Sequence, residues 1–574
     1  MTKNAQLPNI KNILRRIFAA SIPRAFLWPL AEALGWGILG LSVAFVMLAL
    51  HPAPLSNDSY QYLSVAANIR HGNGAATDLV YFDTERSHGR IPAPLTTFPP
   101  GYSAAIGLLS GITGSFETAA RILSAIGYAG TAVLLVSVLI SARVTPLLRA
   151  AVLLLYLTNF VSASFSTAVL TESMFVFVFI ASIAALSLAW RNTQHPYGRL
   201  LWTVAGMTLA GFSYWIRYAG LFLIAALVLC VVLRFIRLRS RIGASELYAA
   251  LIPIGMAGAL MARNVFQVGT WKGGNDLPVS NPLRRVLADF MRAQLHIFTG
   301  EHAVNFGLWE ALLLLGSLGL GALLVRVILC DGCGSGALLH RLDGLWLLPF
   351  TCAAIYSVGL CYAGLHTVIS FGTRMFLPVL PIYLLLLGLV LHWLISRASF
   401  RGGQVWFWAT LCALVIGYAG VNARDLNMPQ AETRQSYLSG LFAERTTNGL
   451  SLSDWVNAHI GPTAVIAAQD GQATGYLLQR RALGMVESEY SAERWECPEI
   501  RVQMNRFDAR YLILYRHPDQ RTHLLEESGF AAEAANGQPK CGFVIAAENR
   551  DVRILEIGPL PEETGHQEAP RPYD

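Results

Sequence analysis

Residues 168–190 read Ala-Val-Leu-Thr-Glu-Ser-Met-Phe-Val-Phe-Val-Phe-Ile-Ala-Ser-Ile-Ala-Ala-Leu-Ser-Leu-Ala-Trp. After Glu172 this stretch contains no ionisable side chain. A helix that crosses the hydrocarbon core of a bilayer needs about 20 mainly apolar residues. The stretch therefore predicts a membrane-spanning helix with a single carboxylate at one end.

The rest of the chain repeats this pattern. Of its 574 residues, 54% are hydrophobic and only 14% are Asp, Glu, Lys or Arg, whereas soluble domains carry about 25% charged residues. We expect a mainly α, polytopic membrane protein with about eleven spans by the same length rule. The expected spans are 32–50, 118–142, 147–165, 168–190, 200–216, 218–236, 247–265, 307–328, 343–363, 374–396 and 404–421.

The basic residues orient these spans, because Lys and Arg in short loops stay on the cytoplasmic side. The basic residues gather in the N-terminal segment and near 143–149, 191–199, 234–241, 326–341 and 397–401. These loops share one side if the apolar segment Pro99–Ser115 is an interfacial or re-entrant helix and does not cross. The N-terminus is then cytoplasmic and the C-terminus is outside. The net charge of +7 acts as an orientation signal without a basic patch, which argues against nucleic acid as a partner.

Two long segments are expected outside the cytoplasm. The first extracytoplasmic loop, 51–117, belongs to a transmembrane domain at 1–421. The second segment, 422–574, is richer in charge and contains strand and capped-helix patterns, which predict a small extracytoplasmic α/β domain. Its cysteines, Cys497 and Cys541, lie in a compartment that permits disulfides, and their pairing is left open. The strand patterns are Ala464–Ala468, Arg510–Tyr515, Phe543–Ala546 and Val552–Ile557.

The most informative charged residues lie at the outer ends of expected spans. Asp58 follows the first span, Glu172 opens the fourth, Arg217 ends the fifth and Arg374 opens the tenth. Each has a structural interpretation: Asp58 as a helix N-cap, Glu172 at a positive helix end, and the arginines reaching lipid head groups. As a set, two carboxylates and two guanidiniums at one membrane depth suit a reaction on an anionic, lipid-linked substrate. Arginine binds phosphate through two parallel hydrogen bonds, and a carboxylate takes a proton from an attacking hydroxyl.

The order of these motifs resembles a known family. An Asp follows the first span, Thr97-Phe98-Pro99-Pro100 opens an interfacial segment, Arg217-Tyr218-Ala219-Gly220 ends the fifth span, and Arg-x-x-x-Pro-x-x-Pro runs from Arg374 to Pro381. The set, across 1–421, resembles the GT-C membrane glycosyltransferases that use polyprenyl-phosphate sugars, and most their ArnT-like and protein O-mannosyltransferase branch. Where the family often has Glu-Lys-Pro-Pro, this chain has Thr97–Pro100 and lacks that acid and base. No segment matches the Trp-Trp-Asp motif of oligosaccharyltransferases, which counts against transfer of a whole glycan.

The resemblance implies transfer of one sugar, with inversion, from an undecaprenyl- or decaprenyl-type phosphate donor to a hydroxyl on a glycan, lipid or protein. It implies a bacterial inner membrane, with the C-terminal domain in the periplasm. Asp58 matches the family's acceptor-activating Asp, and Glu172 stands where the family often has Asp. No cofactor is specified, and a divalent cation, Mg²⁺ or Mn²⁺, is left open. The donor-phosphate candidates are Arg217, Arg374, Arg263 and Lys272, and the candidate sugar or acceptor contacts are Tyr60, Tyr62, Tyr102 and Tyr218.

Two alternatives come from other classes of protein. A transporter or lipid-linked-sugar flippase would place its binding site near the bilayer midplane, where these spans carry almost no charge. A non-catalytic cell-envelope assembly protein would leave the charges at the outer boundary without a role. The sequence leaves open which sugar is transferred, the acceptor, the metal dependence, the oligomeric state and the role of the C-terminal domain.

Overall fold

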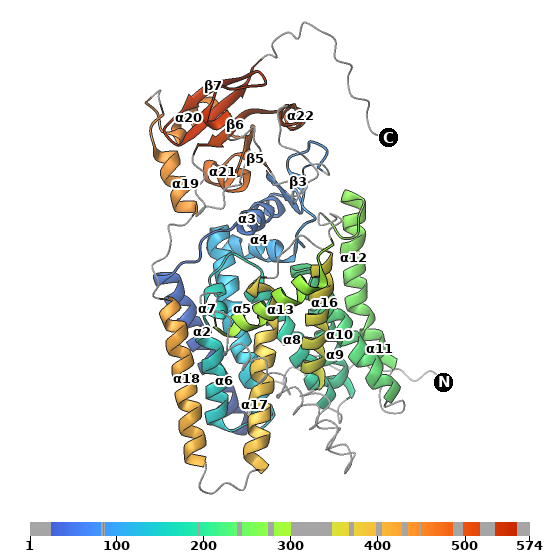
Figure 1. Cartoon of the computed structure of the whole chain (residues 1–574). Helices are drawn as coiled ribbons and strands as arrows, with labels where there is room; N and C mark the ends of the chain where they lie inside the picture. The colour runs from blue at the N-terminus through green and yellow to red at the C-terminus, as the bar shows by residue number, and fades with distance from the viewer. Residues whose placement is uncertain are drawn as a thin grey trace, which may run out of the picture.

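The structure is a computed structural model, and it shows a bundle of helices with a β sheet beyond one end (Figure 1). Within the described residues, six helices are long and apolar enough to cross a membrane, so the chain is a multi-pass membrane protein. The expected span 307–328 lies outside these residues. The described residues are 24–81, 84, 87–191, 196–237, 244–273, 280–299, 347–366, 372–397, 404–426, 434–446, 449–485, 498–516 and 534–558.

The long helices of the bundle expose apolar side chains on their outer surface. Phe45, Val358 and Ile416, for example, are largely exposed. Contiguous apolar surface of this kind marks contact with a membrane. The helices are α2 (Arg24–Leu50), α5 (Phe116–Ser141), α6 (Pro146–Leu157), α8 (Glu172–Arg191), α9 (Pro196–Ile216), α10 (Gly220–Arg237), α11 (Ala244–Ala249), α12 (Leu251–Val268), α13 (Leu283–Thr299), α16 (Leu348–Leu365), α17 (Leu380–Arg397) and α18 (Gln404–Leu426).

The expected span 147–165 is wrong as a single helix. α6 ends at Leu157, and a short helix, α7 (Phe160–Phe165), begins after Asn159. The Asn159 side chain accepts a hydrogen bond from the Ser162 amide, and its Nδ2 donates to the Ile297 carbonyl at 2.7 Å. Asn side chains compete with the helix for backbone hydrogen bonds, which explains why the helix breaks here.

Two helices of the first loop lie across the end of the bundle nearest the sheet (Figure 1). They are α3 (Asn57–Arg70) and α4 (Gly101–Thr113), and α4 is the apolar segment that was predicted to be interfacial. A Cβ on Gly107 would lie 3.1 Å from the Ala66 carbonyl, so glycine allows the two helices to approach closely. The same loop contains an antiparallel pair of short strands, β1 (Ala76–Thr77) and β3 (Ala93–Pro94).

The larger sheet has the strand order β2-β5-β4-β6-β8-β7. Strands β2, β5, β4 and β6 run parallel, whereas β8 and β7 are antiparallel to their neighbours. The four strand patterns read from the sequence are present, but β5 (Arg481–Gly484) and β2 (Leu79–Val80) were not predicted. Because β2 comes from the first loop, the loop supplies an edge strand to the sheet. The other elements are β4 (Val465–Ala468), β6 (Ala509–Tyr515), β7 (Phe543–Glu548), β8 (Val552–Ile557), α19 (Arg434–Ala443), α20 (Leu452–His459), α21 (Gly471–Leu478) and α22 (Glu499–Arg506).

Cys541 is disulfide-bonded. The remaining cysteines among the described residues are free. Cys497 is outside the described residues, and its pairing with Cys541 stays a prediction.

Candidate active site

The four charged residues that the sequence predicts at outer span ends come together in the structure. Arg374 Nη1 donates to Asp58 Oδ2 at 3.0 Å, and Arg217 Nη1 donates to Glu172 Oε1 at 2.7 Å. Arg374 Nε lies 4.0 Å from Glu172 Oε1, which joins the two ion pairs. We call these residues the charge cluster: Asp58, Glu172, Arg217 and Arg374. Its two carboxylates balance its two guanidiniums.

Asp58 lies in the first turn of α3, but it does not cap this helix. Ser56 is the N-cap residue, and it forms a capping box with Ser59. The interpretation of Asp58 as an N-cap is therefore wrong. Because the two serines satisfy the backbone at the start of α3, the Asp58 carboxylate is available to Arg374.

Glu172 is the first residue of α8, and its side chain is only 3% exposed. Its Oε1 accepts the hydrogen bond from Arg217, the residue that follows α9, and its Oε2 lies 3.5 Å from the donating hydroxyl of Thr171. A buried carboxylate needs such partners, since its desolvation is costly. Arg217 thus pairs with a carboxylate inside the protein, which makes the lipid-head-group interpretation wrong for this residue.

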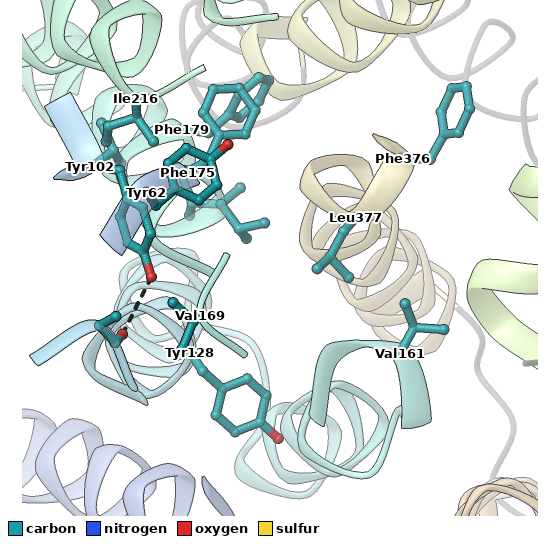
Figure 2. Packing of buried hydrophobic residues seen from close by; sticks show 14 of the residues in the cluster. Tyr62, Tyr102, Tyr128, Val161, Val169, Phe175, Phe179, Ile216, Phe376 and Leu377 are labelled. Carbon is teal, nitrogen blue, oxygen red and sulfur yellow. Dashed lines mark hydrogen bonds between the residues drawn. The ribbon is translucent and has the colours of Figure 1, made fainter. Parts of the chain in front are cut away.

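Arg374 lies in η3, the 3-10 helix Thr373–Val379 that precedes α17. Phe376 and Leu377 of this helix are buried, and the Phe376 ring lies 5.2 Å from the ring of Phe290 in α13. In Figure 2 Phe376 and Leu377 lie across the core from Phe175 and Phe179 of α8. The apolar side of η3 packs in the core, and this packing holds Arg374 near Asp58. Arg374 forms an ion pair with Asp58, which the lipid-head-group interpretation did not include.

Tyr62 lies beside the charge cluster. Its ring is 5.1 Å from the Phe98 ring and 5.3 Å from the Tyr102 ring. Figure 2 shows Tyr62 next to Tyr102. Burial raises the pKa of Tyr62 above its ordinary value; the two carboxylates of the cluster raise it further, whereas Arg217 lowers it. Tyr62 therefore keeps its proton at neutral pH. The Tyr102 hydroxyl lies 3.4 Å from Ser124 Oγ in the core.

Tyr60 and Tyr218 make contacts that tie elements of the fold together. The buried Tyr60 ring lies 5.1 Å from the ring of Tyr476 in α21. The Tyr218 hydroxyl donates to the Thr96 carbonyl at 2.6 Å and accepts from Asn264 Nδ2 at 2.9 Å. Tyr218 thus connects the segment before α4 to α12. The expected contact of either tyrosine with sugar or acceptor stays a prediction.

Arg263 has a structural role that the sequence did not predict. Its Nη2 donates to the carbonyls of Ala75 and Leu95, both at 3.1 Å. These carbonyls flank the β1–β3 pair, so Arg263 clamps the first loop to α12. Lys272 Nζ lies 5.8 Å from the centre of the Trp271 ring, a cation–π contact. A role for Arg263 or Lys272 at a donor phosphate stays a prediction.

The charge cluster fits a metal ion poorly. Each of its carboxylates is already paired with an arginine. In the part of the chain that the structure describes, no three His, Cys, Asp or Glu side chains gather as metal ligands.

Comparison with solved structures identifies the fold. No protein-family model matches the sequence, and no curated protein matches it. The crystal structure of ArnT from Cupriavidus metallidurans bound to undecaprenyl phosphate is similar with a TM-score of 0.53 and 13% sequence identity, over 94% of this chain and 99% of that chain. The archaeal oligosaccharyltransferase AglB from Archaeoglobus fulgidus gives a TM-score of 0.46 at 12% identity, over 84% of this chain and 69% of that one.

The chain therefore shares the fold of ArnT, which agrees with the GT-C-like fold that the resemblance in the sequence implies. The likeness to ArnT extends over nearly the whole length of both chains.

Proposed function

We propose that this chain is a membrane glycosyltransferase that transfers a single sugar from a polyprenyl phosphate to an acceptor hydroxyl on the extracytoplasmic side of a bacterial inner membrane. The charge cluster carries the proposal. It places a partly exposed carboxylate, Asp58, beside a partly exposed guanidinium, Arg374, which lies at the start of an apolar span. The shared fold supports the proposal, since the ArnT structure contains undecaprenyl phosphate.

In this mechanism Asp58 accepts the proton of the attacking hydroxyl. The acceptor oxygen forms a bond to the anomeric carbon as the bond from that carbon to the phosphate oxygen breaks, which inverts the configuration. Arg374 neutralises the departing lipid phosphate, and Arg217 supplies a second positive charge nearby. The leaving phosphate needs no general acid, because it departs as a stable anion held by cationic donors. Glu172 orients Arg217 and Arg374, to which its Oε1 lies 2.7 and 4.0 Å away.

The position of the cluster favours this mechanism over transport. Glu172 is the first residue of α8 and Arg217 follows the last residue of α9, so the charges lie at helix ends. A transporter would place its binding groups near the middle of the membrane. The same proposal assigns 1–421 to catalysis and 422–574 to a periplasmic α/β domain, with a cytoplasmic N-terminus.

The test supplies purified protein with radiolabelled polyprenyl-phosphate sugars and candidate acceptors. We expect Asp58→Asn to reduce the rate of sugar transfer by about 10²–10⁴-fold, the usual contribution of a general base. Arg510→Ala is the matched control, because it removes an ion pair within the sheet, to Glu556. Equal rates for the parent and Asp58→Asn would overturn the site assignment. No use of any lipid-linked sugar by the parent would overturn the proposed function.

A further inference from the structure

Asp78 connects the sheet to the helix that carries Asp58. On the side of α3, its backbone N–H donates to Ser64 Oγ at 2.9 Å, and its Oδ2 accepts from Asn68 Nδ2 at 2.8 Å. On the side of the sheet, its Oδ1 lies 3.3 Å from Arg481 Nε, and its carbonyl accepts from the Ala482 amide at 2.9 Å. One residue thus forms two contacts with α3 and two with β5.

A second, buried contact lies closer to Asp58. Gln61, one helical turn after Asp58, donates from Nε2 to the Leu79 carbonyl at 2.7 Å and accepts from Thr77 Oγ1 at 2.9 Å. Gln61 is fully buried. Leu79 belongs to β2 and pairs with β5 in a parallel register. The second turn of α3 is therefore bonded directly to the edge strand of the sheet.

A direct contact between α21 and α3 adds to the same connection. The ring of Tyr476 in α21 lies 5.1 Å from the ring of Tyr60, two residues after Asp58. A Cβ on Gly475 would lie 2.6 Å from the Leu79 side chain, so α21 packs tightly on β2. Helix α3 rises about 1.5 Å per residue and moves as one rigid element. Movement of the sheet edge therefore shifts Asp58 as well.

We infer that Asp78 is a positioning residue for Asp58 and that the role of the sheet is to hold α3 in the orientation that the transfer reaction requires. The inference rests on the proposed function for its effect on rate. Proton transfer requires the base within hydrogen-bond reach of the acceptor, and a displacement of about 1 Å costs up to about 100-fold in rate. Asp78 acts through α3 and does not touch the substrate.

The experiment compares two variants that cut the connection at opposite ends. Asn68→Ala removes the contact of the Asp78 side chain with α3, and Arg481→Ala removes its ion pair with β5. We expect each variant to lower kcat by about tenfold with little change in donor KM. Each removes part of the support of α3, so Asp58 is displaced by less than the misplacement of about 1 Å that costs up to about 100-fold. Because the two contacts act in series through Asp78, the double variant should lose no more than the larger single loss. Arg481→Lys, which keeps the charge, should restore most of the rate.

Hydrogen exchange of the α3 amides tests the coupling between the sheet and α3 independently of turnover. The proposal predicts faster exchange at 57–66 in both single variants and unchanged exchange in Arg510→Ala, which alters the same sheet away from α3. If the parent transfers no sugar but α3 exchanges faster in the variants, the proposed function is overturned and the coupling between the sheet and α3 is supported. Unchanged exchange and unchanged kcat in Arg481→Ala would overturn the inference. An additive fall in melting temperature in the double variant, with kcat unchanged, would show a merely structural role for these contacts. That result would also overturn the inference.

Discussion

Replacement of Arg374 by alanine tests the proposed mechanism most directly. Arg374 is the more exposed of the two cluster arginines: its side chain is 37% exposed, against 19% for Arg217. Arg217 is committed to the buried Glu172 through a hydrogen bond of 2.7 Å. Arg374 is therefore the guanidinium with an accessible face for a lipid phosphate. We expect Arg374→Ala to lower kcat strongly and to leave the protein folded.

The size of the effect follows from the geometry. Two unit charges about 4 Å apart attract each other by about 4 kcal/mol at an effective dielectric constant of about 20. Removal of one donor that stabilises a developing oxyanion costs about 2.7–4 kcal/mol, or about 10²–10³ in kcat. Since Arg374 is partly exposed, solvent screening places the expected loss at the lower end, about 100-fold. Asp58 keeps access to water in the variant, so its lost ion pair should cost little stability.

The assay is single-turnover transfer of radiolabelled sugar from polyprenyl phosphate by detergent-solubilised protein, with thermal unfolding measured on the same samples. Arg374→Lys keeps the charge but loses the planar pair of donors, so its rate should fall between those of the parent and Arg374→Ala. Arg510→Ala controls for loss of an arginine elsewhere. A rate for Arg374→Ala within about threefold of the parent would refute the reasoning, because a group that stabilises the leaving phosphate contributes far more.

Two further replacements separate stability from catalysis. Glu172→Gln leaves the largely buried Arg217 guanidinium, 19% exposed, without its carboxylate, so we expect destabilisation toward the lower end of about 3–5 kcal/mol, measured as a lower melting temperature. Adding Arg217→Met should recover much of that stability and none of the activity; failure to recover it would contradict the ion-pair explanation. Arg263→Ala removes charge-assisted hydrogen bonds to the Ala75 and Leu95 carbonyls, worth about 1.5–3 kcal/mol each. We expect faster proteolysis of the first loop in that variant. A rise in donor KM with no change in proteolysis would instead support a donor-phosphate role for Arg263.

The depth of the charge cluster could be predicted from the sequence, whereas its pairing could not. Apolar length and the distribution of basic residues place Glu172, Arg217 and Arg374 at span ends on one side. Neither signal reports how the helices are arranged around the bundle. Which carboxylate meets which guanidinium depends on that arrangement, so the ion pairs of Arg217 with Glu172 and of Arg374 with Asp58 appear only in three dimensions.

The contribution of the first loop to the sheet was missed for a related reason. Strand β2 is two residues long, Leu79–Val80, which is too short to show an alternating pattern. Its pairing with β5 joins residues 79 and 482, a separation that no local signal reveals. The clamp formed by Arg263 depends on two backbone carbonyls, which the sequence does not distinguish from any others. The break at Asn159 had a local signal, since asparagine favours caps over helix interiors, but the apolar run masked it.

The exposures of the four charges indicate a division of roles within the cluster. The side chains of Glu172 and Arg217 are 3% and 19% exposed, and those of Asp58 and Arg374 are 20% and 37% exposed. In the proposed mechanism the base must reach the hydroxyl that it deprotonates and a phosphate ligand must reach the phosphate, so the mechanism assigns these roles to Asp58 and Arg374, which form the more exposed ion pair. Glu172 lies within 4.0 Å of Arg374 Nε, so its negative charge holds that guanidinium in place before substrate arrives. Because Asp58 also pairs with Arg374, an incoming lipid phosphate competes with Asp58 for the same cation. Binding of the donor would therefore free the carboxylate to accept a proton, which couples occupation of the phosphate site to activation of the base.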